Sequence, residues 1–281
     1  MRLRIQIGFL VVVGVLMAGV ANVGATHIDP VSIRQLIKEA ELIFEGVVTA
    51  VEYRMSDVAT PDHVALPHTF VTFEIEQTLK GGAAHGRSIT LRFQGGPDDK
   101  GNAMMVSGVP LFDVGNRDVL FVRGNGEQLC PLVGWDQGRF RVIGGLVFTD
   151  NGQEVWLTRR GELAFGPYHA LEEVLTHNLA GTRLEFEGPA AQAGQTPPTG
   201  TQWLDAPSFR NVIAGLVRQW HTPAQLAVLT PVASADIRGA FYVRAPRPEA
   251  PPAVPAAAEE LSPERELQHH DQVPRLDKPG R

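Results

Sequence analysis

Apolar and polar residues alternate with a period of two through the middle of the chain, which is typical of β-strands with one buried face. Between residues 69 and 80, Val71 and Phe73 fall on one face and Glu74 on the other. A nearly continuous apolar run over 42–53 is typical of a central strand. The pattern predicts strands over 42–53, 69–80, 88–93, 118–122 and 139–143, and two strands of a hairpin within 146–157.

Turn residues support this interpretation. Asp150, Asn151 and Gly152 join the two apolar runs of the hairpin, and they accept the positive φ of a tight turn. Gly46 interrupts the first strand and predicts a bulge or a close backbone approach. So many strands with no helix between them predict a mainly β fold, an antiparallel barrel or sandwich. A parallel nucleotide-binding sheet does not fit.

A helical period appears at both sides of this region. Asp29 as N-cap and Pro30 at the first helical position predict a short helix that ends near Ala40. Apolar residues recur with the same period over 168–179 and 208–220. We expect these helices to pack on the β-structure. The alternative, a membrane-surface or partner-binding helix, is less favoured because the polar sides are poor in Lys and Arg.

The N-terminal segment has the features of a signal peptide. Arg2 and Arg4 precede an apolar run over 5–21, and small residues at 23–25 form a cleavage site. The sequence therefore predicts a secreted or periplasmic protein with a signal peptide over 1–25. An uncleaved anchor is the alternative, and it is the only membrane contact that we expect.

Composition divides the remainder of the chain. We expect a β-barrel-like domain over 26–160 and a helical or mixed C-terminal elaboration over 161–244, with a loop at 188–200. Residues 245–281 are rich in Pro and Ala and poor in branched apolar residues, which predicts a disordered tail. The formal net charge is -6 with both signs interspersed, so no nucleic-acid partner is expected. No cofactor is predicted either.

Catalytic constellations are weak in this sequence. Ser107 does not lie in a G-x-S-x-G motif. Cys130, the single cysteine, lies in an apolar neighbourhood and is more typical of a core residue than of a nucleophile. Glu74 and Glu76 could form a carboxylate pair, but a solvated strand face explains them better. The charged turn at 159–160 has the same interpretation, with an anion-binding patch as the minor alternative. We predict no catalytic residue.

Metal ligands are similarly sparse. His63 and His68 share a polar loop with Asp57 and Asp62, without the spacing of a helical pair or a zinc finger, and they are the candidate metal ligands. If cleavage fell one residue later than the preferred site, His27 would become N-terminal and could bind copper through its amine and imidazole.

The order of strands resembles that of exported bacterial proteins with an OB-like barrel, over roughly residues 40–145. AELIFEGVVTAVEY, TFVTFEIEQTLKGG, SITLRF and VLFV carry the resemblance. The layout is also similar to netrin and metalloproteinase-inhibitor modules. Inhibitors of that family present an N-terminal Cys to the target zinc and contain disulfides, whereas this chain has Cys130 alone, so no inhibitory residue is carried over. The resemblance implies a closed or partly open antiparallel barrel that binds another macromolecule without catalysis.

The segment VSGVPLFDVGNRDVLFV, residues 106–122, is a turn-rich loop that leads into a strand. Leu111 and Phe112 lie between its two turns. Exposed at the loop tip, they would contact a partner; the other interpretation buries them under the open end of the barrel.

We therefore expect an exported, non-catalytic binding protein whose partner is a protein or a cell-surface macromolecule. The alternative is a secreted hydrolase whose groups converge only in three dimensions, as in a cleft that unites two carboxylates, or His63, His68 and an acid.

Overall fold

The computed structural model describes residues 31–84, 86–188 and 200–245. The signal peptide predicted over 1–25, His27 and the predicted helix start at 29–30 lie outside these residues. So do most of the loop at 188–200 and the tail predicted over 245–281, apart from Ala245.

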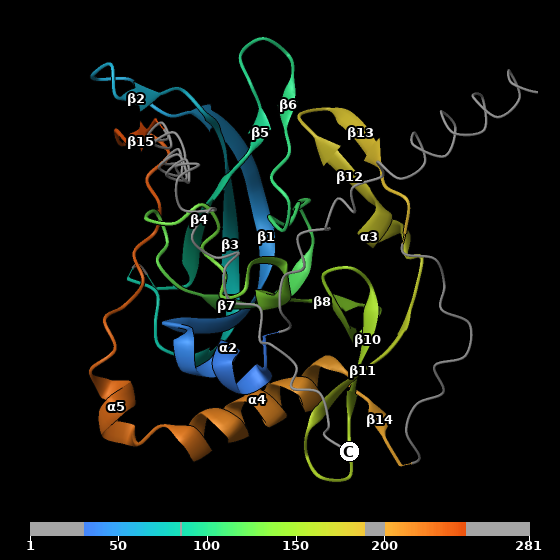
Figure 1. Cartoon of the computed structure of the whole chain (residues 1–281). Coiled ribbons are helices and arrows are strands. Elements are labelled where there is room, and N and C mark those ends of the chain that lie inside the picture. The colour runs from blue at the N-terminus through green and yellow to red at the C-terminus, as the bar shows by residue number, and fades with distance from the viewer. Residues whose placement is uncertain (1–30, 85, 189–199, 246–281) are drawn as a thin grey trace, which may run out of the picture. The chain divides into compact units, whose positions relative to one another are not determined.

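The described residues contain more strands than helices (Figure 1). The strands are β1 (Leu42–Met55), β2 (His63–Val64), β3 (Pro67–Lys80), β4 (Ser88–Gln94), β5 (Gly96–Pro97), β6 (Ala103–Met104), β7 (Arg117–Val122), β8 (Arg139–Ile143), β9 (Leu146–Thr149), β10 (Gln153–Leu157), β11 (Leu163–Tyr168), β12 (Thr176–Leu179), β13 (Thr182–Glu185), β14 (Gln202–Trp203) and β15 (Val243–Arg244). The helices are α2 (Ile33–Glu39), the 3-10 turn η1 (Trp135–Gly138), α3 (Glu172–Leu175), α4 (Ala206–Trp220) and α5 (Pro223–Ala227).

A nine-stranded sheet organises the fold, in the order β11-β10-β9-β8-β7-β1-β3-β4, with β14 paired to β10. Its strands pair antiparallel throughout. The predicted mainly β, antiparallel fold is therefore confirmed. No closed barrel is detected among the described residues, because the path of paired strands ends at β4 and at β11.

The long strands β1 and β3 form the centre of this sheet. Their pairing shifts register between Glu45 and Gly46. A Cβ at Gly46 would lie 2.7 Å from the main-chain oxygen of Glu74, so the close approach of the two strands requires glycine here. The predicted bulge is confirmed. Gly152 at the β9–β10 turn has a φ of 85°, as the hairpin prediction requires.

The first part of β1 is buried on both faces of the sheet. On β1, Ile43 packs into a helix-side core with α2 and α4. Its neighbours Leu42 and Phe44 pack into a loop-side core, which includes Phe112 and Cys130. The continuous apolar run over 42–53 thus reflects two cores that share one strand.

Two helices cover the helix-side core (Figure 1). α4 contains the predicted range 208–220 and begins at Ala206. Asp205 caps it by accepting from the amide of Ser208. α2 begins after Ser32, whose hydroxyl accepts from the amide of Gln35. The C-terminal end of α2 is held by Lys80 of β3, whose ammonium donates to the main-chain oxygen of Ile37 at 2.7 Å.

The predicted helix over 168–179 is wrong. Only the four residues of α3 are helical there, and the chain then forms the hairpin β12–β13. The reason is a long-range contact: the carboxylate of Asp113 accepts from the amide of Asn178 at 2.7 Å and contacts His177 Nδ1 at 2.7 Å. These bonds fix an extended backbone that the local apolar period does not reveal. Gly181 lies in the turn of this hairpin with a φ of 87°.

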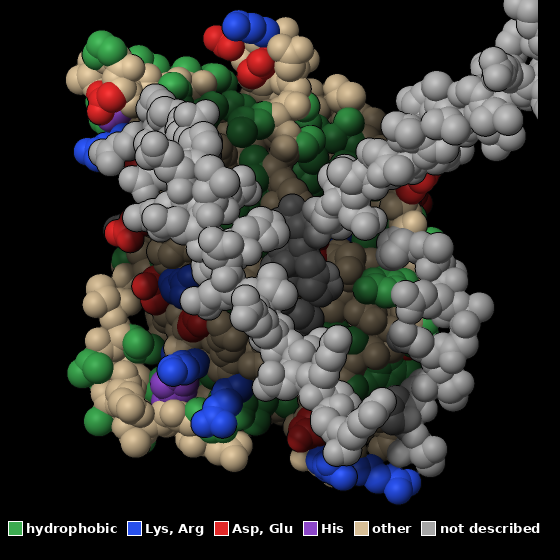
Figure 2. Space-filling view, in the orientation of Figure 1, with side chains coloured by type: hydrophobic (Ala, Val, Ile, Leu, Met, Phe, Trp, Pro, Cys, Tyr) green, Lys and Arg blue, Asp and Glu red, His purple; other side chains and the backbone are tan. Residues whose placement is uncertain are grey.

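The described residues up to Val243 form one compact unit. None of the helices in the described ranges is long and apolar enough to cross a membrane. On the face shown in Figure 2, charged side chains of both signs are interspersed among apolar and other groups where the described residues form the surface.

Candidate functional site

A pocket of about 390 Å³ opens between α2, η1, the β9–β10 hairpin and β11. Its apolar and aromatic lining consists of Val31, Ile33, Leu36, Phe140, Phe165 and Tyr168. Its polar lining consists of Asp136, Gln137, Thr149, Asp150, Asn151 and Gln153. Phe165 is 49% exposed, so the pocket presents an aromatic side chain to solvent. A pocket of this size and mixed lining is typical of small-molecule sites.

The backbone around η1 places Asp136 in this pocket. Gly134 and Trp135 both have left-handed backbones, with φ of 66° and 62°. The amide of Asp136 then donates to the main-chain oxygen of Gly108 at 2.9 Å. Burial raises the pKa of the Asp136 carboxyl to about 6, and the negative charge of Asp150 adds to the effect.

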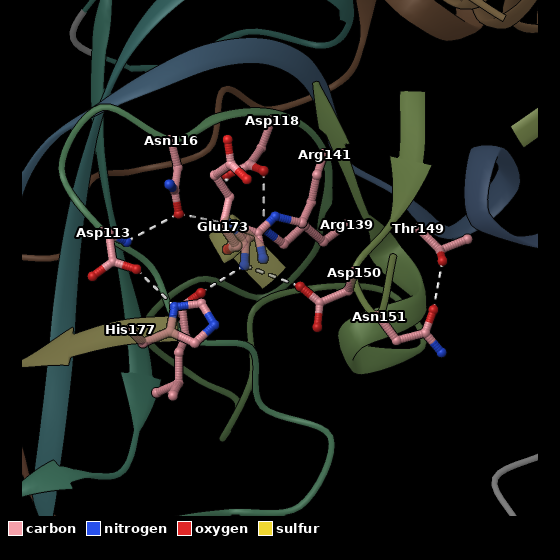
Figure 3. A network of polar contacts seen from close by, with 11 residues as sticks. Asp113, Asn116, Asp118, Arg139, Arg141, Thr149, Asp150, Asn151, Glu173 and His177 are labelled. Carbon is pink, nitrogen blue, oxygen red and sulfur yellow. Dashed lines mark hydrogen bonds and ion pairs between the residues drawn. The ribbon is translucent and has the colours of Figure 1, made fainter. Parts of the chain in front are cut away.

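Asp150, at the hairpin turn, forms an ion pair with Arg139. The Oδ1 of Asp150 accepts from Nη1 of Arg139 at 3.0 Å, and the Asp150 side chain is 22% exposed. Figure 3 shows Asp150 reaching the Arg139 guanidinium from the turn, with Thr149 and Asn151 beside it. The two carboxylates of the pocket therefore differ: Asp150 has a cationic partner, and none of the described residues forms an ion pair with Asp136.

Arg139 is the centre of a buried polar network (Figure 3). It donates to both carboxylate oxygens of Asp118 and to Oδ1 of Asn116. The ring of Phe112 lies 4.0 Å from the guanidinium carbon. Burial alone would lower the pKa of Arg139, but the charges of Asp118 and Asp150 outweigh it and raise the pKa. The network fixes the wall behind the pocket.

The pair formed by Asp113 and His177 extends this network, because the amide of Asp113 donates to Asn116. Burial alone would raise the pKa of Asp113, but hydrogen bonds from His177 and Asn178 lower it. His177 is 8% exposed and lies outside the lining of the pocket. No imidazole is among the residues that line it.

Phe112 is buried rather than exposed at a loop tip, with 4% of its surface accessible. It contacts the rings of Phe73 and Phe93 at 5.6 and 4.9 Å between centroids. Leu111 is half-buried, and its main-chain oxygen accepts from Arg139. The expectation of an exposed Leu111–Phe112 tip is corrected in favour of burial, because Phe112 packs in the loop-side core and its ring lies against the guanidinium of Arg139.

His63 and His68 have separate surroundings. His63 contacts Thr60 at 2.8 Å and packs on the ring of Tyr242. His68 is 4% exposed, and its Nδ1 contacts the main-chain oxygen of Leu66. Burial lowers the pKa of His68. Across the described part of the chain, no group of three or more His, Cys, Asp or Glu side chains is arranged to hold a metal ion.

The other sequence candidates do not line the pocket. Cys130 is buried, as predicted for a core residue, and burial raises the pKa of its thiol to about 12. Glu74 and Glu76 are exposed, and Glu76 pairs with Arg117 at 2.6 Å. Ser107 is exposed, and so is the charged turn at 159–160.

Sequence reasoning missed Asp136, Asp150 and Arg139 as a group. The alternation in β8 does place Arg139 opposite Phe140, but nothing local shows that this polar face is buried. Asp136 belongs to a turn in which Trp135 follows Gly134 in the left-handed region, a conformation that is uncommon for tryptophan and that the sequence does not indicate.

A scan against protein-family models found no matching family, and searches of curated proteins and of solved structures gave no match.

Proposed function

We propose that this protein is an exported, non-catalytic binding protein whose pocket beside α2 takes a small ligand with an apolar body and a protonated amine. The observation that carries the proposal is Asp136, an acid held in a half-apolar pocket without an ion-pair partner among the described residues.

The apolar lining favours a ligand with hydrocarbon or aromatic surface. Phe165 exposes 49% of its surface at the pocket, and Phe140 and Leu36 connect the lining to the helix-side core. Covering such surface stabilises a complex by roughly 25 cal/mol per Å² of apolar area removed from water. The volume of about 390 Å³ fits a ligand of modest size.

The acidic groups favour a cation. Asp136 and Asp150 line the same pocket, and of these two acids Arg139 forms an ion pair only with Asp150. An ammonium group next to Asp136 would offset both its burial and its repulsion by Asp150. A carboxylate ligand would add a third negative charge. A protonated amine is therefore the polar group that this pocket selects.

Matched probes test this selection by titration calorimetry at pH 7.5. Hexylamine, hexanol and hexanoate share one apolar chain and differ in charge. We expect hexylamine to bind at least tenfold more tightly than hexanol, and hexanoate not to bind. Asp136→Asn should remove the preference for the amine, whereas Asp99→Asn, at an exposed acid, should keep it. Equal binding of the three probes would contradict the proposal.

A hydrolase is the second candidate, and the two carboxylates that line one pocket favour it. Asp136, protonated up to about pH 6, would be the general acid. Nitrophenyl glycosides and esters provide the test. Turnover that falls as pH rises through about 6 and is lost in Asp136→Asn would replace the binding proposal. We favour binding because the apolar half of the lining offers few groups to hold a sugar.

The proposal also includes two further parts, export of the protein and closure of the sheet into a partly open barrel. The N-terminal sequence over 1–25 supports export, and the strand order over 40–145 supports a partly open, OB-like barrel that also contacts a macromolecule. The mass of the protein recovered outside the cytoplasm tests export: a chain that begins at Thr26 is expected, and retention of residues 1–25 would contradict it.

A further inference from the structure

A smaller pocket of about 170 Å³ lies between the loop that precedes β7, the end of β8 and α3. Its lining includes Gly115, Asn116, Arg117, Arg141, Gly144 and Glu173. None of these residues lines the pocket beside α2. The proposed amine site therefore does not account for it.

Arg141 is the unusual member of this lining. Only 2% of the residue is exposed, yet no described carboxylate forms an ion pair with it. Within the described ranges it forms one hydrogen bond, from Nη2 to the main-chain oxygen of Glu173 (Figure 3). Burial and the neighbouring charge of Arg139 lower the pKa of Arg141 to about 10. A guanidinium has five N–H donors, and most of those of Arg141 have no acceptor among the described residues.

Asn116 supplies a second donor. Its amide oxygen accepts from the amide of Asp113 at 3.0 Å and from Nη2 of Arg139 at 3.1 Å. Both bonds fix the oxygen toward the network, so the NH₂ group is left to donate elsewhere. We propose that this pocket binds a small oxyanion, such as inorganic phosphate or sulfate, between the guanidinium of Arg141 and the amide of Asn116.

The surrounding charges set the strength of this binding. Arg117 is shared with Glu45 and Glu76 at 3.5 and 2.6 Å, so it adds little. Glu173 lines the rim and opposes an anion. Asp113 and Asp118 lie behind Arg141, but each already has its own donors. With one uncompensated cation against a rim carboxylate, we expect a dissociation constant of about 1 mM at low ionic strength.

Calorimetric titration of the full-length protein with phosphate and with sulfate tests the site, against chloride at equal ionic strength. Saturable phosphate or sulfate binding near 1 mM, absent with chloride, supports it. Arg141→Gln should weaken the binding at least tenfold, and Arg183→Gln, at an arginine with 61% side-chain exposure, should not. No saturable binding to the wild type, or binding unchanged by Arg141→Gln, would overturn the proposal.

A second variant keeps the test valid if Arg141→Gln does not fold. Glu173 is exposed, and its main-chain oxygen, which accepts from Arg141, is retained in Glu173→Gln. Removing the rim carboxylate should tighten phosphate binding about threefold to tenfold. Glu172→Gln, one residue away and also exposed, is the matched control. An equal effect of the two substitutions would show general surface charge instead of a site, and it would overturn the inference.

Discussion

Arg139 and Asp118 form a bidentate ion pair in which neither side chain has exposed surface. Nε–Oδ1 and Nη2–Oδ2 are both 3.0 Å. The same guanidinium donates to the main-chain oxygen of Leu111 at 2.6 Å and to Asp150 at 3.0 Å. One side chain thus connects the loop before β7, strand β7 itself and the β9–β10 turn. The rear wall of the pocket beside α2 depends on this connection.

Arg139→Met should destabilise the protein strongly. The substitution leaves the carboxylate of Asp118 buried without its partner, and breaking a buried pair in this way costs about 3–5 kcal/mol. Urea unfolding monitored by tryptophan fluorescence measures the change. Arg183→Met is the control, because its pairs with Glu172 and Glu185 are exposed and should add little to stability. Similar losses in both variants would show that the buried network does not determine stability.

Phe112→Ala should cost about 3–5 kcal/mol, because it leaves a cavity among Phe73, Phe93 and Arg139. Leu111→Ala, at the half-buried neighbour, should cost less than Phe112→Ala. The same unfolding measurement compares them. If Phe112→Ala is neutral for stability, the ring is a surface contact after all.

Asp136→Asn should change how stability depends on pH. The carboxyl has a pKa of about 6 in the folded state and 3.8 ordinarily. Stability linked to its protonated form is therefore fully present below about pH 4 and is lost as pH rises through about 6. Asn stays neutral, so we expect the free energy of unfolding of Asp136→Asn to change little near pH 4. At pH 7.5 we expect it to rise by about 1 kcal/mol, a figure that already allows for the partial exposure of the carboxyl. Unfolding at the two pH values measures this, and Asp99→Asn should show no such trend.

Cys130 should be unreactive in the folded protein. Burial raises the pKa of the thiol to about 12, so almost no thiolate is present at pH 8. A colorimetric thiol reagent should label Cys130 only in denaturant, at the rate of unfolding. Labelling of the native protein within seconds would show that the loop-side core opens readily.

The main strands between residues 42 and 157 were predictable because their signal is local, whereas β11, β12 and β13 were not predicted. β4 and β8 follow the alternation of their own side chains, and the β9–β10 turn follows from Asp150, Asn151 and Gly152. The double burial of β1 also leaves a local trace, since a strand with two apolar faces reads as a continuous apolar run. What such a run cannot indicate is which elements cover each face, so a barrel and a sheet between two cores look alike.

The pocket was not predictable, because its groups come from separated segments. Burial in the folded protein raises the pKa of Asp136, and the charge of Asp150, which comes from a separate turn, adds to the effect. His177 is extended because Asp113, far away in the sequence, binds it. Apolar spacing over 168–179 therefore predicts a helix that the long-range bond prevents.

The most direct test of the amine-binding pocket is to locate a bound amine by NMR. Hexylamine is titrated into ¹⁵N-labelled protein, and the side-chain amides of Gln137, Asn151 and Gln153 are followed, because all three line the pocket. We predict saturable shifts at these amides, with none at Asn125, which bonds to the main chain near β4. No shifts at the pocket amides, or equal shifts at Asn125, would contradict the account.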